Sequence, residues 1–142
     1  YVEQLTEACG LVAAGVDRRD GWELVYQSRS GPPSQPWLEP DVVDRLRELH
    51  AAGTRDAVLV PIGFLSDHME VVYDLDTEAR QAAEQLGINL IRAATPGTHP
   101  RFIRMIRELI EERLDPNQPR LALGELGPAP DECPVDCCRP NK

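Results

Sequence analysis

The feature that most constrains the fold is an almost continuous apolar run, AVLVPI at residues 57–62, which ends at a glycine. Runs of this length and composition are typical of a strand buried on both faces of a parallel sheet. The pattern then changes to helical spacing, and Asp67 and Glu70 have the spacing of a capping box. We therefore expect a strand, a tight turn and a helix that continues to about residue 86, where Gly87 ends it.

The remaining segments alternate in the same way. Helical spacing, helix-start signals and short apolar runs predict helices over residues 1–16, 39–52 and 102–114 and strands over 22–27 and 88–91, with loops over 28–40 and 93–100. Short alternating helices and strands predict a parallel sheet with right-handed crossovers. The predicted fold class is α/β, a three-layer Rossmann-like parallel sheet with flanking helices.

The chain divides into two parts. Residues 1–114 carry the periodic pattern and form the predicted α/β domain, whereas residues 115–142 are rich in Pro and Gly, lack periodicity and contain three of the four cysteines. We expect this second part to be an irregular tail.

Charge and hydropathy exclude several classes of partner. A net charge of −9 argues against a nucleic-acid backbone or an anionic membrane as the partner. No apolar run approaches the ~18 residues of a membrane-spanning helix, and no basic-then-apolar leader is present. We expect a cytoplasmic protein without an integral membrane segment.

Three carboxylates recur at four-residue intervals in the helix after residue 67. Glu70, Asp74 and Glu78 fall roughly along one face, where like charges repel by about 0.2–0.5 kcal/mol per pair. A relay for a cation and an ordinary solvated helix face both account for this acidic stripe. Oxygen ligands hold hard or borderline cations weakly enough to pass them on.

The loops that leave the carboxyl ends of parallel strands meet at one rim, where ligands bind in open α/β sheets. The loop over residues 28–40 brings Ser28 and Trp37 to this rim, and Trp37 suits a flat aromatic ligand. Trp37 as a loop anchor that packs on the core is the alternative.

Three segments in this order resemble those of ferrochelatases, the enzymes that insert ferrous iron into a porphyrin in haem biosynthesis. The segments are YQSRSGPPSQPWLEP at 26–40, PIGFLSDHMEVVYDLDTE at 61–78 and RAATPGTHPRF at 92–102. The resemblance covers residues 1–114 and is strongest to the actinobacterial type, which acts on coproporphyrin III. It implies an enzyme of the lyase class with Fe²⁺ and a porphyrin, coproporphyrin III or protoporphyrin IX, as substrates.

The resemblance also implies roles for individual residues. Glu70 matches the glutamate of an Asp-His-x-Glu motif that faces the porphyrin and takes part in metal binding and pyrrole deprotonation. Asp74 and Glu78 match an acidic ladder that conducts metal or protons, and Ser28 and Trp37 match residues that line the porphyrin pocket. Deprotonation suits a buried carboxylate with a raised pKa, which we expect Glu70 to be.

One element of the family pattern is absent from this sequence. The histidine that opposes the glutamate belongs to a His-Ser-hydrophobic-Pro loop, and none of His50, His68 or His99 lies in such a segment. We therefore expect the chain to be the C-terminal half of a ferrochelatase, which needs the N-terminal half as its partner. A half-length homodimeric chelatase and a non-catalytic porphyrin- or metal-binding module are the alternatives.

The cysteines form a separate feature. Cys133, Cys137 and Cys138 place three thiols within six residues, and some ferrochelatases of this type carry a [2Fe–2S] cluster on C-terminal cysteines. Because such a cluster needs four ligands, the prediction includes a fourth cysteine, Cys9 or one outside this chain. Cys9 lies on the apolar face of the first helix, where a buried structural thiol is expected. A tail with incidental cysteines is the alternative.

Overall fold

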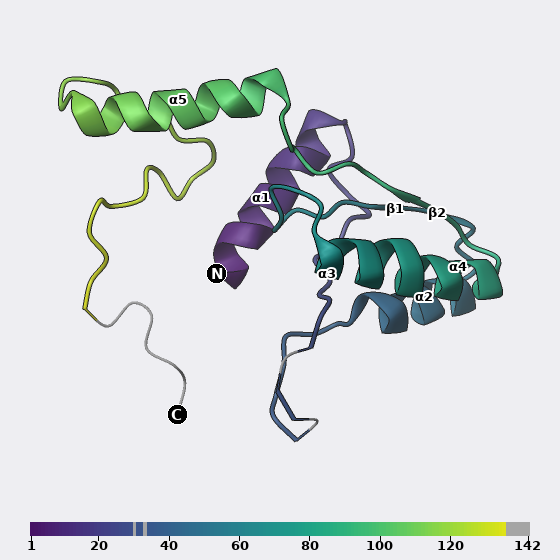
Figure 1. The fold of residues 1–142 in the computed structure, drawn as a ribbon. Helices are drawn as coiled ribbons and strands as arrows, with labels where there is room; N and C mark the ends of the chain where they lie inside the picture. Colours follow the sequence, from purple (N-terminus) through teal and green to yellow (C-terminus); the bar gives the residue numbers. More distant parts are fainter. Residues whose placement is uncertain (30, 33, 136–142) are drawn as a thin grey trace.

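The structure, a computed structural model, describes residues 1–29, 31, 32 and 34–135 (Figure 1). Helices and short strands alternate along the chain as predicted, except that the helix after residue 67 has a π-helical middle and residues 22–27 form no strand. The elements are α1 (Val2–Gly15), α2 (Val42–Ala51), β1 (Asp56–Leu59), α3 (Met69–Val71), the π-helix η1 (Val72–Ala79), α4 (Arg80–Leu86), β2 (Asn89–Arg92) and α5 (Pro100–Leu114).

The sheet is a parallel pair joined by a helical crossover. β1 and β2 pair in register from Asp56 opposite Asn89 to Leu59 opposite Arg92. The crossover between them is one continuous helix made of α3, η1 and α4. This confirms a parallel α/β unit, and β1 and β2 are the strands of the sheet among the described residues.

The predicted strand over residues 22–27 is wrong. Its backbone makes one isolated parallel bridge, between Tyr26 and Asp41. The Tyr26 amide donates to the Pro40 carbonyl at 2.9 Å and the Tyr26 carbonyl accepts from the Val42 amide at 2.8 Å. The segment therefore bonds to the start of α2 instead of to the sheet.

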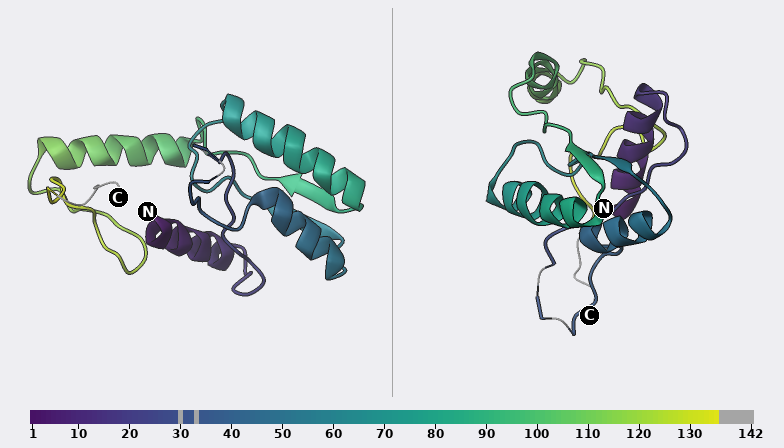
Figure 2. Two further views of the ribbon diagram at one scale, coloured as in Figure 1. Left: turned by 90° about the horizontal axis from the view of Figure 1, so that it is seen from below. Right: turned by 90° about the vertical axis from the view of Figure 1, so that its right-hand side faces the viewer.

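Figure 2 shows α2 and the crossover helix on the same side of the two strands, and the core lies between these helices and the sheet. Its buried members are apolar and come from α2, the crossover helix and the residue before β2: Val42, Leu46, Val71, Leu75, Ala79, Ala83 and Ile88. Ala57, Leu59 and Leu90 of the strands pack against this cluster. Two layers, helices on a sheet, make up this part of the molecule.

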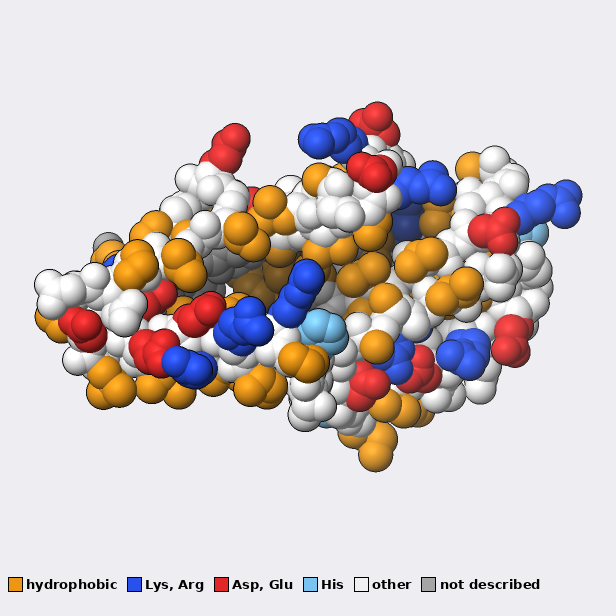
Figure 3. All heavy atoms as spheres, turned by 90° about the horizontal axis from the view of Figure 1, so that it is seen from above, with side chains coloured by type: hydrophobic (Ala, Val, Ile, Leu, Met, Phe, Trp, Pro, Cys, Tyr) orange, Lys and Arg blue, Asp and Glu red, His pale blue; other side chains and the backbone are white. Residues whose placement is uncertain are grey.

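The opposite face of the sheet is open. Val58 is 69% exposed and Ile91 56% exposed. The prediction that both faces of this strand are buried is wrong for the described residues, and these residues form no third layer on this face. α5 does not close this face, because none of its residues is buried, and hydrophobic side chains gather on the side of the molecule seen in Figure 3.

Side chains cap two of the helices at their N-termini. Asp41 caps α2 by accepting from the Val43 and Asp44 amides, and His99 caps α5 by accepting from the Arg101 amide at 3.2 Å. The predicted capping box of Asp67 and Glu70 is wrong. His68 occupies the cap position of α3 and makes no side-chain cap bond. The Asp67 carboxylate has other partners, described below.

Residues 115–135 contain no helix or strand. The backbone amides of Glu125 and Leu126 donate to the Glu7 carboxylate of α1. Within the described ranges, no helix has both the length and the apolarity needed to cross a membrane.

Candidate metal-handling site

The acidic stripe lies on a helix whose middle is π-helical. η1 spans Val72–Ala79, and the Thr77 hydroxyl donates to the Val72 carbonyl, five residues earlier. π-helical segments are rare, occur mostly as single turns and are frequent at functional sites. The helix that carries Glu70, Asp74 and Glu78 is therefore locally wider than an α-helix.

The sequence contains a signal for this wide turn that the periodicity analysis missed. Buried apolar residues on the crossover helix recur every four positions: Val71, Leu75, Ala79 and Ala83, all at most 3% exposed. In an α-helix of 3.6 residues per turn, each four-residue step advances by about 40°, so three steps would carry the last residue about 120° from the first. Because an i→i+5 turn is wider, the four-residue repeat keeps facing the core.

The stripe carboxylates have the same four-residue spacing, and each directly precedes a residue of the buried repeat. The stripe therefore lies beside the buried face of the helix. Asp74 is half-buried, whereas Glu70 and Glu78 are exposed. Burial raises the pKa of Asp74, and the negative charges of Glu78, Glu70 and Asp41 raise it further. The expectation of a buried Glu70 is wrong, and the half-buried carboxylate with a raised pKa is its neighbour one turn along.

Ser28 reaches this stripe from the loop over residues 28–40. Its hydroxyl donates a hydrogen bond to Asp74, and Gln27 donates to the Ser28 hydroxyl at 3.5 Å. Ser28 has a φ of +57°, in the left-handed region, which directs the chain into the loop. Trp37, further along this loop, is 37% exposed. The structure thus brings Ser28 and Asp74 into contact and leaves part of the Trp37 ring accessible.

Arg92, the last residue of β2, connects the helix to the sheet. Its guanidinium donates to both carboxylate oxygens of Asp76, at 2.9 and 2.7 Å, and to both oxygens of Asp67, at 3.0 and 3.1 Å. The Thr95 hydroxyl also donates to Asp67 at 3.0 Å. The hydrogen bond from Arg92 holds the pKa of Asp76 below its usual range. Sequence reasoning did not identify this network.

The loops after β1 and β2 meet at the carboxyl edge of the sheet, as predicted for a parallel sheet. The Ala93 amide donates to the Leu59 carbonyl and the Gly97 amide to the Leu65 carbonyl, each at 2.8 Å. Together with the Thr95–Asp67 bond, these contacts fix the loop that leads into Glu70.

The histidines have separate local roles. The His68 ring makes an edge-to-face contact with Phe64, with centroids 5.0 Å apart, His99 caps α5, and His50 is exposed in the last turn of α2. Among the residues that the structure describes, no three Asp, Glu, His or Cys side chains converge as a ready-made metal cluster. The acidic stripe is thus a row of separate carboxylates, not a closed cage.

The cysteines divide between α1 and the tail. Cys9 is partly buried, and burial raises the pKa of its thiol. Cys133 is exposed and carries a free thiol. Cys137 and Cys138 lie outside the described residues.

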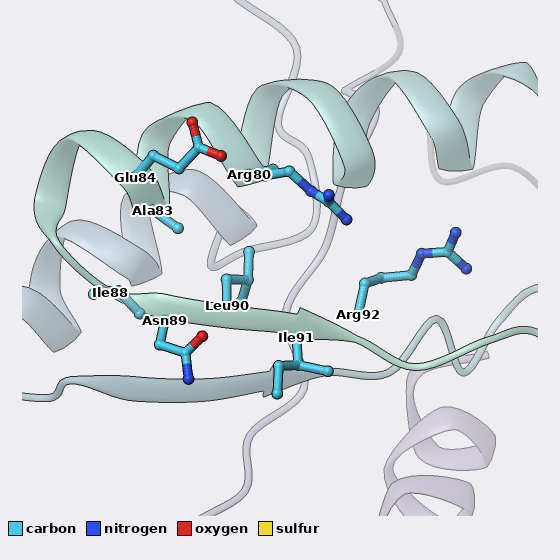
Figure 4. A pocket seen from close by; sticks show the side chains of 8 residues that line it. All are labelled: Arg80, Ala83, Glu84, Ile88, Asn89, Leu90, Ile91 and Arg92. Carbon is cyan, nitrogen blue, oxygen red and sulfur yellow. The ribbon is translucent and has the colours of Figure 1, made fainter.

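A shallow depression of about 400 Å³ lies between β2 and α4, the last part of the crossover helix (Figure 4). Glu84, Asn89 and Ile91 line it, and Arg80 and Arg92 lie at its same end. None of the predicted site residues lines it.

The chain is a parallel α/β unit with carboxylates on a partly π-helical crossover helix beside the rim loops. The family model of ferrochelatases matches residues 1–114. The chain belongs to the ferrochelatase family.

Similar proteins are coproporphyrin III ferrochelatase from Frankia alni, 56% identical over all of this chain and 38% of the relative, and ferrochelatase from Rhodopirellula baltica, 55% identical over 97% of this chain and 39% of the relative. Coproporphyrin III ferrochelatase from Streptomyces coelicolor is 50% identical over 97% of this chain and 39% of the relative. The chain spans about two fifths of the length of these relatives.

Proposed function

We propose that this chain forms the acidic wall of a ferrochelatase active site that inserts Fe²⁺ into coproporphyrin III. The observation that carries the proposal is the stripe of Glu70 on α3 and of Asp74 and Glu78 on the π-helix that continues it, in a chain similar over its full length to a coproporphyrin III ferrochelatase. Fe²⁺ and the porphyrin are the substrates.

Metal insertion requires two pyrrole N–H protons to leave as the cation enters. Glu70 is the residue of the stripe nearest the rim loop and acts as the base that accepts a proton from the ring. Asp74 supports this step because its raised pKa favours proton uptake. Glu78, one turn further, continues a row of oxygen ligands that bind a divalent cation weakly enough to release it.

The loop over residues 28–40 supplies the surface for the macrocycle. The accessible part of the Trp37 ring offers a flat apolar contact to the porphyrin. The Ser28 hydroxyl, bonded to Asp74, links this loop to the stripe. Binding the ring here places its nitrogens beside carboxylates that accept its protons.

The second wall of the pocket comes from polypeptide outside these residues. Two observations support this: the open apolar face with Val58 and Ile91, and the relatives' length, of which this chain spans about two fifths. A histidine in that polypeptide opposes Glu70.

The test is iron insertion by the complete encoded protein, followed as loss of porphyrin fluorescence with coproporphyrin III and with protoporphyrin IX. We expect activity with coproporphyrin III and loss of it in Glu70→Gln, but not in Glu84→Gln, which removes the same charge from an exposed position on α4. Porphyrin binding without turnover would instead identify a binding module. Full activity of a dimer of the 142-residue chain would identify a half-length chelatase.

The tail cysteines support a second, separate proposal, a [2Fe–2S] cluster. Three thiols within six residues and an exposed, free Cys133 suit thiolate ligation, with a fourth ligand outside the tail. Anaerobically purified complete protein should absorb in the visible range and contain inorganic sulfide, and Cys133→Ser should reduce both. Colourless, sulfide-free protein refutes this proposal and leaves the chelatase proposal unaffected.

A further inference from the structure

We propose that Arg92 is a positioning residue that fixes the π-helical form of Val72–Ala79 and thereby the aim of Glu70 and Asp74. The inference rests on the proposed function and assigns a role to a residue that contacts none of the stripe carboxylates in its hydrogen bonds.

The π-helix needs contacts outside itself. An eight-residue run is long for a form that mostly occurs as single turns within α-helices, so contacts beyond the helix must favour it. The buried four-residue repeat favours it on the core side. On the sheet side, the contact is the guanidinium of Arg92.

Arg92 binds the chain at two points, one just before the crossover helix and one within η1, that bracket Glu70 and Asp74. Asp67 lies three residues before Glu70, and Asp76 lies two residues after Asp74. One planar guanidinium binds both carboxylates, and its side chain is only 13% exposed. Water therefore competes weakly with the bonds to Asp76, whose side chain is 22% exposed, and more strongly with those to Asp67, which is 42% exposed. A short connection through one guanidinium fixes both ends of the segment that carries Glu70 and Asp74.

Reversion to an α-helix would break this arrangement. Replacing the i→i+5 bonds by i→i+4 bonds takes one residue out of the wide turn and rotates the preceding helix by about 100° relative to the part that follows. Asp67 and Asp76 would then move relative to each other, and one guanidinium could no longer bind both. The two ion pairs therefore select the π-helical form.

The test compares two matched Arg→Lys changes in the complete encoded protein. Arg92→Lys keeps the charge but loses the planar fork that binds two carboxylates. Arg80→Lys is the control, because Arg80 lies 3.8 Å from the same Asp76 and is 55% exposed. We expect Arg92→Lys to lower kcat by about 10- to 100-fold without changing the KM for coproporphyrin III. Arg80→Lys should leave both constants unchanged.

Crystal structures of the two variants provide a readout that does not depend on activity. We expect i→i+4 bonds over residues 72–79 in Arg92→Lys and the π-helix in Arg80→Lys. Asp76→Asn, which keeps the shape of its side chain, should repeat the kcat loss of Arg92→Lys, and the double variant should lose no more than either single one.

A wild-type kcat in Arg92→Lys overturns the inference, and so does a lower kcat with the π-helix intact. If the wild-type protein itself inserts no iron, the proposed function fails, but the structures still decide the register. A π-helix retained in Arg92→Lys then overturns the inference on its own.

Discussion

The two sides of the sheet differ sharply in how completely they are packed. On the helical side, Val71, Leu75 and Ala79 are almost fully buried against α2 and the strands. On the other side, Val58 and Ile91 are exposed and α5 buries none of its residues. The acidic stripe lies on the helix that belongs to the packed side.

This difference indicates which side holds side chains in fixed positions and which side offers a surface for a partner. Catalytic groups need neighbours that lock their positions, and the stripe has them in the core repeat, Ser28 and Arg92. Exposed apolar side chains of α5, such as Ile106 and Leu109, are suited to being covered by other polypeptide. Under the proposed function, the packed side holds the chemistry and the open side is covered by other polypeptide.

The largest expected effect tests whether the chemistry belongs to the packed side. In the complete protein, Glu70→Gln should lower kcat for iron insertion by about 10²- to 10⁴-fold, because it removes a general base. Asp74→Asn and Glu78→Gln should slow the reaction less, and porphyrin binding should persist in all three, as checked by absorption titration. Wild-type rates in Glu70→Gln would remove the central assignment.

The next prediction compares a Leu→Ala substitution in the packed core with one on exposed α5. Leu75→Ala removes a side chain that is 3% exposed and should reduce the free energy of unfolding by about 2–5 kcal/mol. Leu109→Ala on α5, where the side chain is 47% exposed, should change it by less than about 0.5 kcal/mol in the 142-residue chain. Urea unfolding followed by circular dichroism measures both.

The complete protein sharpens this comparison. If other polypeptide covers α5, Leu109→Ala should become clearly destabilising there, while the cost of Leu75→Ala stays the same. Equal effects of Leu109→Ala in both proteins would contradict the interpretation of α5 as a partner surface.

Much of the architecture could be predicted from the sequence because its signals are local. Helical spacing and stop residues such as Gly87 located the helices, and the apolar runs located β1 and β2. The predicted rim also formed, since parallel strands bring their carboxyl ends to one edge. The motif predicts Ser28 as a site residue, but it contains no signal for the hydrogen bond from Ser28 to Asp74.

The errors arose where distant groups compete for the same atoms. Asp67 has the spacing of a capping residue, but Arg92, 25 residues away, binds its carboxylate. Residues 22–27 have a strand pattern, but their backbone bonds to the start of α2. Such pairings depend on the folded chain and leave no trace in local spacing, whereas the four-residue apolar repeat did contain the signal for the π-helix.

The third prediction concerns the pH dependence of the bond between Asp76 and Arg92. Hydrogen bonds to charged groups contribute about 1.5–3 kcal/mol, so Asp76→Asn should destabilise the protein by about this amount at neutral pH. Because the folded-state pKa of Asp76 is lowered, its contribution is complete above the unfolded value of about 3.9 and is lost as the pH falls through the folded value. The difference in unfolding free energy between wild type and Asp76→Asn should therefore shrink below about pH 4. A difference that stays constant from pH 7 to pH 3 would contradict the ion-pair account.

The smallest expected effect is a gain in stability, whereas the preceding stability changes are losses. It concerns Asp74→Asn, which should stabilise the fold and slow the reaction. The raised pKa of Asp74 means that its ionised form is less favourable in the folded protein than in the unfolded one. Asp74→Asn keeps an oxygen that can accept from Ser28 and removes repulsion from Glu70 and Glu78, about 0.2–0.5 kcal/mol for each like-charge pair. The variant should therefore be more stable than wild type at pH 7 by about 0.4–1 kcal/mol, although it inserts iron more slowly. As the pH falls through the folded pKa of Asp74, wild type becomes neutral there too, and the advantage should vanish below the unfolded pKa. Paired urea titrations at pH 7 and in acid measure this, and an Asp74→Asn variant that is less stable than wild type at pH 7 would show that its carboxylate stabilises the fold instead of straining it.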